Sequence, residues 1–408
     1  MSRNAPAPAP RAEGPLRSPW THVTRVAAAL AAGMGVGRFV YTPILPLMHT
    51  QAGLSTAAGA HLATANYVGY LLGALAGTLI PALVRSRTVL RASLALLIAT
   101  LAAMPATHST TAWIALRLLA GLASALIFVI AVNSLLGHLR NHPPHLPGWG
   151  FGGVGAGIAL SGLLVLALRS VADWQVAWWS SAALATALAA AAWNLRPEIP
   201  PAPSTDAPDR VVDPWFGALF VSYTLEGVGY IVAGTFLVAA IGQSSPGWIG
   251  SGAWVLVGLA AVPSSAIWAR LGRRWSRPGL LCVALVIQAV GIALPALVGG
   301  VAAALVSAVL FGATFIGVST LALAAGAELQ FPRSVALLTA GYSVGQILGP
   351  LAVAPLLHHG YRPALLLAAV VVLAAAVTAA VLRTGFPRRR AVTLRHSAPV
   401  RDVRTAGR

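Results

Sequence analysis

Lysine is absent from this sequence, cysteine occurs once, and charged residues of any kind are scarce. They make up 9% of the 408 residues, and only nine of them are acidic. A soluble domain carries about 25% charged residues, so the composition excludes a soluble enzyme. The absence of lysine excludes a phosphate-binding loop of the Gly-Lys-Ser type. The single cysteine, Cys282, excludes an intramolecular disulfide and a thiolate metal cluster.

Apolar side chains dominate instead, in long runs that follow one another with short interruptions. Hydrophobic residues account for 57% of the chain, and one membrane span needs about 20 such residues. Backbone groups inside a bilayer must be hydrogen-bonded within their own segment, so each run is predicted to be a helix. The predicted fold class is therefore an all-α polytopic membrane protein with twelve transmembrane helices, at roughly 24–48, 57–83, 89–107, 111–137, 148–168, 174–194, 214–241, 248–270, 278–298, 300–324, 334–357 and 361–382.

The arginines indicate how these spans are oriented. All 27 basic residues are arginine, and all but four lie in the tails or in loops on one side of the predicted membrane. The other side holds only Arg169 and Arg362, while Arg38 and Arg117 lie inside spans. Because basic residues concentrate in cytoplasmic loops, we expect both termini in the cytoplasm and the chain in a bacterial plasma (inner) membrane. The basic charge then reflects topology and does not indicate a nucleic-acid partner.

A proline-rich linker divides the spans six and six. It covers 195–213 and contains four of the nine acidic residues. We predict a disordered cytoplasmic tail over 1–20, an N-terminal six-helix bundle over 21–194, a C-terminal six-helix bundle over 214–383 and a basic cytoplasmic tail over 384–408.

The two halves resemble each other in sequence. Gly35-Val36-Gly37-Arg38 in the first span aligns with Gly227-Val228-Gly229-Tyr230 in the seventh, 192 positions later. Arg117 and Gly121 in the fourth span align with Ala308 and Gly312 in the tenth, 191 positions later. This nearly constant offset indicates an internal duplication, which predicts two bundles of the same topology.

Three motifs resemble one family of membrane transporters. The run Gly33-Met-Gly-Val-Gly-Arg-Phe-Val-Tyr-Thr-Pro-Ile-Leu-Pro-Leu-Met48, the run Asn66-Tyr-Val-Gly-Tyr70 and the run Gly345-Gln-Ile-Leu-Gly-Pro350 resemble the YbfB/YjiJ group of the major facilitator superfamily. The resemblance covers 24–382. It implies two pseudo-symmetric six-helix bundles around a central solute site, and transport without a cofactor.

Other superfamily patterns are only partly present. The run Arg270-Leu-Gly-Arg273-Arg274, after the eighth span, resembles the cytoplasmic loop motif, with Ala269 where an acid is usual. The resemblance implies a gating role for these arginines, which the missing acid weakens. Arg117 with Gly121 resembles a fourth-helix pattern linked with proton coupling. The fifth span lacks the Gly-Pro pair typical of drug antiporters.

Two charged residues lie about a dozen residues inside their spans and therefore near the middle of the bilayer. They are Arg38 in the first span and Glu226 in the seventh. An ionised group at that depth costs several kcal/mol unless it is paired or faces a wet cavity. We predict that they meet in the central cavity and that Glu226 is the titrating group of a proton-driven transporter. A static pair that holds the halves together is the alternative.

Further polar residues inside the spans are candidates for the wall of a solute site, because such sites place a few polar groups on an apolar surface. They are Tyr41, Asn66, Tyr230 and Gln346. Arg117 lies about 9 Å from its helix start at 1.5 Å per residue, so its side chain either reaches outward to the interface or takes part in proton coupling. Gln288 is expected to serve packing or the lipid interface.

Glycines recur every four residues in two spans that face each other across the halves in the resembled fold. They are Gly69, Gly73 and Gly77 in the second span and Gly341, Gly345 and Gly349 in the eleventh. Small residues at this spacing let a second backbone approach closely. We predict that these stripes slide during gating, and simple tight packing is the alternative.

Together these features predict a secondary transporter that moves a small organic solute by alternating access, with protons as the candidate coupling ion. The central charges favour an anionic or zwitterionic solute. Export of amphipathic compounds is one alternative, and a transporter-like sensor or scaffold without transport is another. No nucleophile–base constellation at a common depth is recognisable, so we predict no enzymatic activity. We expect a monomer whose partners are the solute, protons and the lipid bilayer, with no metal.

Overall fold

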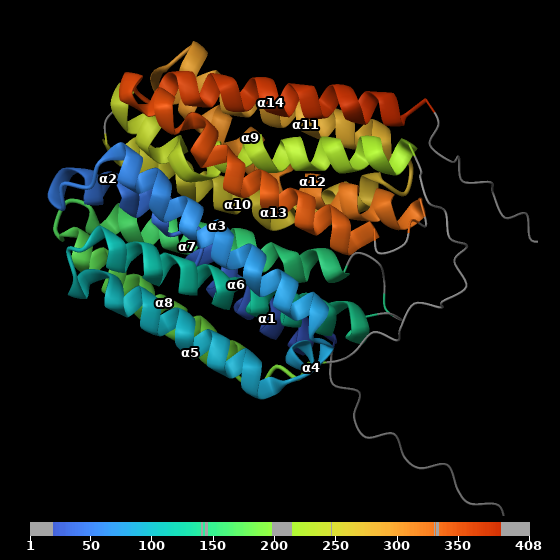
Figure 1. The fold of residues 1–408 in the computed structure, drawn as a ribbon, viewed down its shortest axis with the longest axis horizontal. Coiled ribbons are helices and arrows are strands. Elements are labelled where there is room, and N and C mark those ends of the chain that lie inside the picture. The colour runs from blue at the N-terminus through green and yellow to red at the C-terminus, as the bar shows by residue number, and fades with distance from the viewer. Residues whose placement is uncertain are drawn as a thin grey trace, which may run out of the picture.

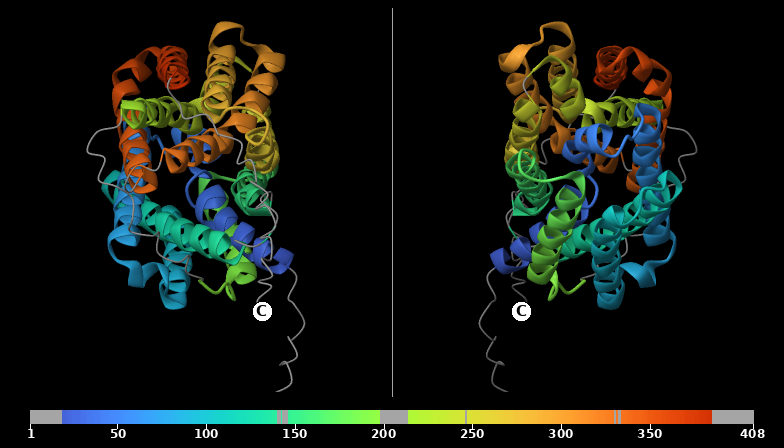
Figure 2. Two further views of the ribbon diagram at one scale, coloured as in Figure 1. Left: turned by 90° about the vertical axis from the view of Figure 1, so that its right-hand side faces the viewer. Right: turned by 90° about the vertical axis from the view of Figure 1, so that its left-hand side faces the viewer.

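The computed structural model describes residues 19–139, 142, 146–197, 214–245, 247–329, 331 and 334–384. Within these residues every regular element is a helix. The helices lie roughly parallel in two stacks, with α1 to α8 in one and α9 to α14 in the other (Figure 1). The end-on views separate the same two stacks (Figure 2). We call the end where α1 begins and α14 ends the proximal end, and the opposite end the distal end.

The N-terminal half contains eight α-helices and two short elements of other kinds. They are α1 Pro19–Leu30, the π-helix η1 Ala31–Val36, α2 Tyr41–Gln51, α3 Thr56–Leu79, α4 Pro81–Val84, α5 Arg87–Ala103, the 3₁₀-helix η2 Met104–Ala106, α6 Thr110–His138, α7 Leu146–Leu168 and α8 Trp174–Ala192. Four of these helices begin with a side-chain N-cap, which accepts a hydrogen bond from a backbone N–H of the first turn. The capping residues are Ser55, Ser86, Ser109 and Asp173. Such N-caps satisfy donors that the helix itself leaves free.

The C-terminal half contains six α-helices and one 3₁₀-helix. They are α9 Pro214–Ser244, α10 Gly247–Leu271, α11 Arg277–Leu297, α12 Gly300–Glu328, α13 Ser334–Val353, η3 Ala354–His359 and α14 Tyr361–Leu382. Two of the distal turns depend on glycine, because Gly299 and Gly360 have φ angles of 69° and 92°. Residues that carry a side chain rarely adopt a positive φ angle, so these two turns need glycine.

Eleven helical segments in the described chain are long and apolar enough to cross a membrane. The predicted sixth span coincides with α8, which has 19 residues and is not among the eleven. Its first turns hold Trp174, Gln175, Trp178, Trp179 and two serines, which lower its hydropathy. The predicted count of twelve spans therefore stays a prediction, whereas the segments themselves match the predicted runs within a few residues.

Equivalent helices pack in equivalent ways in the two halves. Gly121 of α6 lies against the carbonyl of Asn66 in α3, and Gly312 of α12 lies against the carbonyl of Val257 in α10. Both members of the second pair follow those of the first by 191 positions. This shared contact supports the duplication that the sequence indicates.

The glycine stripes of α3 and α13 pack inside the halves, which favours the alternative of simple tight packing over stripes that slide during gating. Gly69, Gly73 and Gly77 lie against α6, at Leu118, Leu122 and Val129. Gly341, Gly345 and Gly349 lie against α9, at Phe220, Thr224 and Val228. The two helices do touch each other across the halves, but through other faces. The stripes therefore hold each bundle together.

A different small-residue stripe joins the halves, between α7 and α10. Gly152, Gly155 and Gly162 of α7 lie against Val262, Gly258 and Val255 of α10. Their backbones approach so closely that a Cβ at Gly258 would lie 2.2 Å from the Ala159 nitrogen. Such contact leaves no space for a larger side chain along this seam.

The Gly121 contact predicts a stability difference between two glycine substitutions. A Cβ at Gly121 would lie 1.9 Å from the Asn66 carbonyl oxygen, whereas one at Gly217 of α9 would meet nothing within 4 Å. We expect Gly121→Ala to lower the melting temperature, by an overpacking cost of about 1–3 kcal/mol. Gly217→Ala should match or exceed the wild type, because alanine favours helix. Thermal unfolding of both purified variants checks this, and equal melting temperatures would contradict the packing.

Candidate functional site

The first span is broken near its middle, and the break positions the site. The backbone passes through the π-helix η1 and the turn 37–40 before α2 begins. Glycines at 33, 35 and 37 lie within this break, and prolines at 43 and 46 follow it in α2. Gly37 and Phe39 donate to carbonyls five residues back, at Ala32 and Met34. Such π-type bonding often marks functional sites in helices.

Arg117 of α6 satisfies the carbonyls that this break leaves free. Its guanidinium donates to the carbonyl oxygens of Gly37 and Arg38, with Nη1 at 3.2 Å and Nη2 at 3.1 Å. The side chain is 2% exposed. The prediction that it reaches outward to the membrane interface is therefore wrong, because its planar fork spans two buried acceptors of the first helix.

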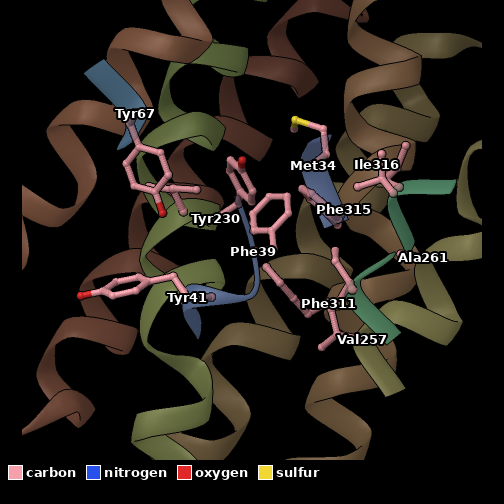
Figure 3. Packing of buried hydrophobic residues seen from close by; sticks show 14 of the residues in the cluster. Met34, Phe39, Tyr41, Tyr67, Tyr230, Val257, Ala261, Phe311, Phe315 and Ile316 are labelled. Atoms are coloured by element: carbon pink, nitrogen blue, oxygen red, sulfur yellow. The ribbon is translucent and has the colours of Figure 1, made fainter. Parts of the chain in front are cut away.

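Tyr41 and Asn66 belong to this arginine cluster. The Arg117 guanidinium lies 4.9 Å from the centre of the Tyr41 ring, and the Tyr41 hydroxyl donates to the carbonyl of Gly59 at 2.9 Å. The Asn66 amide donates to the carbonyl of Arg117 at 2.9 Å. Both side chains thus support the N-terminal half, and Tyr41 is directed away from the central aromatic residues (Figure 3).

Arg38 forms a separate polar chain that crosses to the C-terminal half. Its Nη2 donates to Gln346 Oε1 of α13 at 2.6 Å, and Gln346 Nε2 donates to the Tyr230 hydroxyl of α9 at 2.7 Å. Three of the predicted site residues therefore lie together, one from the first half and two from the second. Gln346 is the link between them.

Aromatic rings surround this chain. The Arg38 guanidinium lies 4.3 Å from the centre of the Tyr70 ring and 4.9 Å from that of Tyr67. The Tyr230 ring stacks on Phe315 at 5.3 Å, and Phe39 meets Phe315 edge-on at 5.5 Å. Figure 3 shows Phe39, Phe315 and Tyr230 side by side. These rings form an apolar wall beside the Arg38 guanidinium.

Arg38 and Glu226 do not pair, which corrects the central prediction from the sequence. Within the described chain, neither carboxylate oxygen of Glu226 has a hydrogen-bond partner, and Arg38 is not among the groups that act on it. The Glu226 side chain is 0% exposed. It interacts with the amide of Gln288 in α11, so it lies inside the C-terminal half.

Gln288 of α11 lies beside Glu226. Its side chain is 0% exposed, which excludes the lipid interface from the two roles that the sequence leaves open and is compatible with packing. Its only signal in the sequence is that it is an uncommon polar residue near the middle of an apolar helix. That signal gives its depth but not the direction of its side chain.

Further hydrogen bonds join the halves on the distal side of Arg38. The Thr42 hydroxyl donates to the carbonyl of Gly234, and the hydroxyls of Tyr67 and Thr235 lie 2.7 Å apart. Nearer the distal end, the Tyr361 hydroxyl lies 3.0 Å from His49 Nε2. The first span thus contacts the C-terminal half at several positions along its length.

A cavity of about 660 Å³ opens at the distal end. Residues of both halves line it, among them Pro43, His49, Arg169, Gln243 and Tyr361. The cavity lies next to the hydrogen bond between His49 and Tyr361. It therefore lies between the two halves.

The basic loop lies at the proximal end. Arg270 lies in the last turn of α10, and Arg273 and Arg274 follow in a turn; all three residues are exposed. Nearby, Arg277 Nη1 pairs with Glu328 Oε1 at 2.8 Å within the C-terminal half. The predicted gating role of the three exposed arginines stays a prediction. No group of three His, Cys, Asp or Glu residues suited to a metal occurs in the described ranges.

Known structures identify the fold. The crystal structure of the nucleoside transporter NupG, in a mutant form, matches with a TM-score of 0.68 over 89% of this chain and 99% of that chain, at 13% sequence identity. That identity shows a shared fold and no more. The chain thus has the fold of this membrane transporter.

The family follows from the sequence. Residues 30–380 match the family described as "uncharacterised MFS-type transporter YbfB", and the chain belongs to this family. The match confirms the resemblance drawn from the motifs of the first, second and eleventh spans. No curated protein matches the chain.

The Arg117 geometry predicts a graded loss of stability. Arg117→Met would leave two buried carbonyls unpaired, at about 1–3 kcal/mol each, so the melting temperature should fall clearly. The melting temperature of Arg117→Lys should fall less, because the lysine ammonium can bond to one of the two carbonyls but not to both. Arg362→Met, at an exposed position, serves as the control and should melt like the wild type. A wild-type melting temperature for Arg117→Met would show that other groups hold the broken helix.

Proposed function

We propose that this protein moves a small anionic or zwitterionic organic solute across the bacterial plasma membrane by alternating access. The solute site is centred on Arg38, with Gln346, Tyr230 and the surrounding rings. The observation that carries the proposal is a guanidinium that is 2% exposed and has no carboxylate partner in the described chain. A buried charge without a counter-ion is costly, and an incoming anion removes that cost.

The donors of Arg38 suit such a solute. Guanidinium has five N–H donors in a fixed fork; one Nη bonds to Gln346, and Nε has no partner. A carboxylate or phosphate can accept two parallel hydrogen bonds from this fork. Phe39 and Phe315 supply an apolar wall for the rest of the molecule. The similarity to a nucleoside transporter adds nucleosides to the compounds to be tested.

The same contacts give the protein a way to change state. The cross-half hydrogen bonds of Thr42, Tyr67 and His49 must break for the distal side to open. The α7–α10 seam keeps the halves in contact while they rock, because its glycines bring the two backbones together without long side chains. The concentration of arginine at the proximal end supports a cytoplasmic location of that end and of both termini. The protein acts as a monomer in this proposal.

Glu226 is the proposed proton-coupling residue, although it does not touch Arg38. It is an acidic side chain buried among the helices of the C-terminal half, and ionisable residues at such depth mark proton relays in transporters. In this arrangement the solute and the proton occupy different places. Their coupling runs through α9, which carries both Glu226 and Tyr230.

Solute binding is tested with purified protein and a panel of metabolites. A ligand raises the melting temperature of the state it binds, so hits are found by thermal shift and confirmed by uptake into liposomes. We expect Arg38→Gln to weaken binding of an anionic hit roughly 10- to 100-fold, since a charge-assisted hydrogen bond contributes about 1.5–3 kcal/mol. Arg38→Lys should keep part of the affinity.

The exposed Arg362→Gln variant is the matched control and should bind as the wild type does. Hits that bind Arg38→Gln and the wild type equally would place the solute elsewhere. A wild-type protein that moves no solute under any gradient would favour the scaffold alternative.

Proton coupling is tested with Glu226→Gln in the same liposomes. We expect a pH gradient to drive accumulation of the solute by the wild type but not by the variant, because an amide carries no exchangeable acid proton. Exchange of labelled for unlabelled solute, which needs no net proton movement, should persist in the variant. Accumulation that survives in Glu226→Gln would assign coupling to another group or to the solute's own gradient.

A further inference from the structure

Glu226 and Gln288 form a polar pair inside the C-terminal half, away from Arg38. Glu226 belongs to α9 and Gln288 to α11, and both side chains are 0% exposed. Their side chains are close enough to interact. Four residues before Glu226, the Ser222 hydroxyl donates to the carbonyl of Ala375 in α14. This face of α9 therefore points toward α11 and α14, not toward the first half.

All four polar atoms of the pair lack a hydrogen bond of normal geometry. These atoms are both carboxyl oxygens of Glu226 and both amide atoms of Gln288. Buried polar atoms nearly always have partners, and inside a membrane each unpaired group costs several kcal/mol. Four unpaired atoms from two adjacent side chains indicate that the two side chains are each other's partners.

An ionised Glu226 cannot satisfy this set. A carboxylate only accepts hydrogen bonds, so the Gln288 N–H would bond to it while the Gln288 carbonyl oxygen had no donor. Glu226 interacts electrostatically with three titratable groups, which are Tyr223 and Tyr230 of α9 and Tyr342 of α13. None of them is a cation, and the described parts of α11 and α14 add no charge to this contact.

A protonated Glu226 satisfies all four atoms at once. Its O–H can donate to Gln288 Oε1 while Gln288 Nε2 donates to the other Glu226 oxygen, which closes a ring of two hydrogen bonds. The rotation needed costs little, because the terminal torsions of Glu and Gln are broad. We infer that Glu226 holds a proton and forms with Gln288 a cyclic acid–amide pair, a proton-binding site within the C-terminal half that is separate from the Arg38 site.

This inference does not rest on transport. The proton is held by the folded protein without any solute, whatever the solute is. Gln288 is a positioning residue in this arrangement: it gives the acid proton an acceptor and the acid oxygen a donor. If the proton also drives transport, it must leave when α9 and α11 move apart.

Infrared spectroscopy of the solute-free protein tests the pair directly. A protonated carboxyl has a C=O stretch of its own, apart from carboxylate and amide bands. We expect this band in the wild type at neutral pH, and we expect it to be lost in Glu226→Gln. That variant should still fold, because two amides can form the same two hydrogen bonds. Absence of the band in the wild type at neutral pH would overturn the inference.

Gln288→Met provides the second variant, since it keeps the volume and removes both partners. We expect the acid band to persist but to shift, because its hydrogen bonds are lost. A band that does not move would show that Gln288 is not the partner.

Stability against pH gives an independent readout. A proton held in the folded state and released on unfolding makes stability fall as pH rises. The wild type should therefore lose stability relative to Glu226→Gln between mildly acidic and alkaline pH. Parallel profiles would overturn the inference. Stabilisation of the wild type by sodium, without stabilisation of Glu226→Gln, would also overturn the inference. This result would show that the carboxylate oxygens of Glu226 bind a cation and not a proton.

Discussion

Arg117 and the broken first span together shape the centre of this transporter. A membrane helix that leaves its regular hydrogen-bonding pattern exposes carbonyls which no water can satisfy. Here the guanidinium of Arg117 takes two of them, at Gly37 and Arg38. The break in turn directs Arg38 toward Gln346 in the other half. One arginine thus stabilises the backbone so that another can face the partner bundle.

The structure keeps its two deepest opposite charges apart. Arg38 lies among aromatic rings at the contact between the halves, and Glu226 lies beside Gln288 within one half. Each has an amide for its neighbour instead of a counter-ion. A direct ion pair would neutralise both groups and leave neither available to a ligand. In the proposed mechanism the anion and the proton would occupy separate sites, with α9 as the element common to both.

Corresponding positions of the two halves share their packing but not their chemistry. Gly121 and Gly312 make the same contact in the two halves. The polar residues do not repeat: Asn66, Arg117 and Arg38 align with Val257, Ala308 and Tyr230. The N-terminal half therefore supplies the buried cations, and the C-terminal half supplies the tyrosine that shares Gln346 with Arg38. The two bundles have diverged where a solute would bind.

A helix needs a certain number of residues to cross lipid, and this is why the helical segments could be predicted from the sequence, while the family could be predicted from its motifs. The direction of each side chain could not be predicted in this way. Position along a helix follows from counting, but successive residues turn through about 100°, and the neighbour on each face depends on how the bundle assembles. Tertiary packing therefore decided that Arg38 meets Gln346, that Glu226 meets Gln288, and that the glycines of α3 and α13 lie inside the halves.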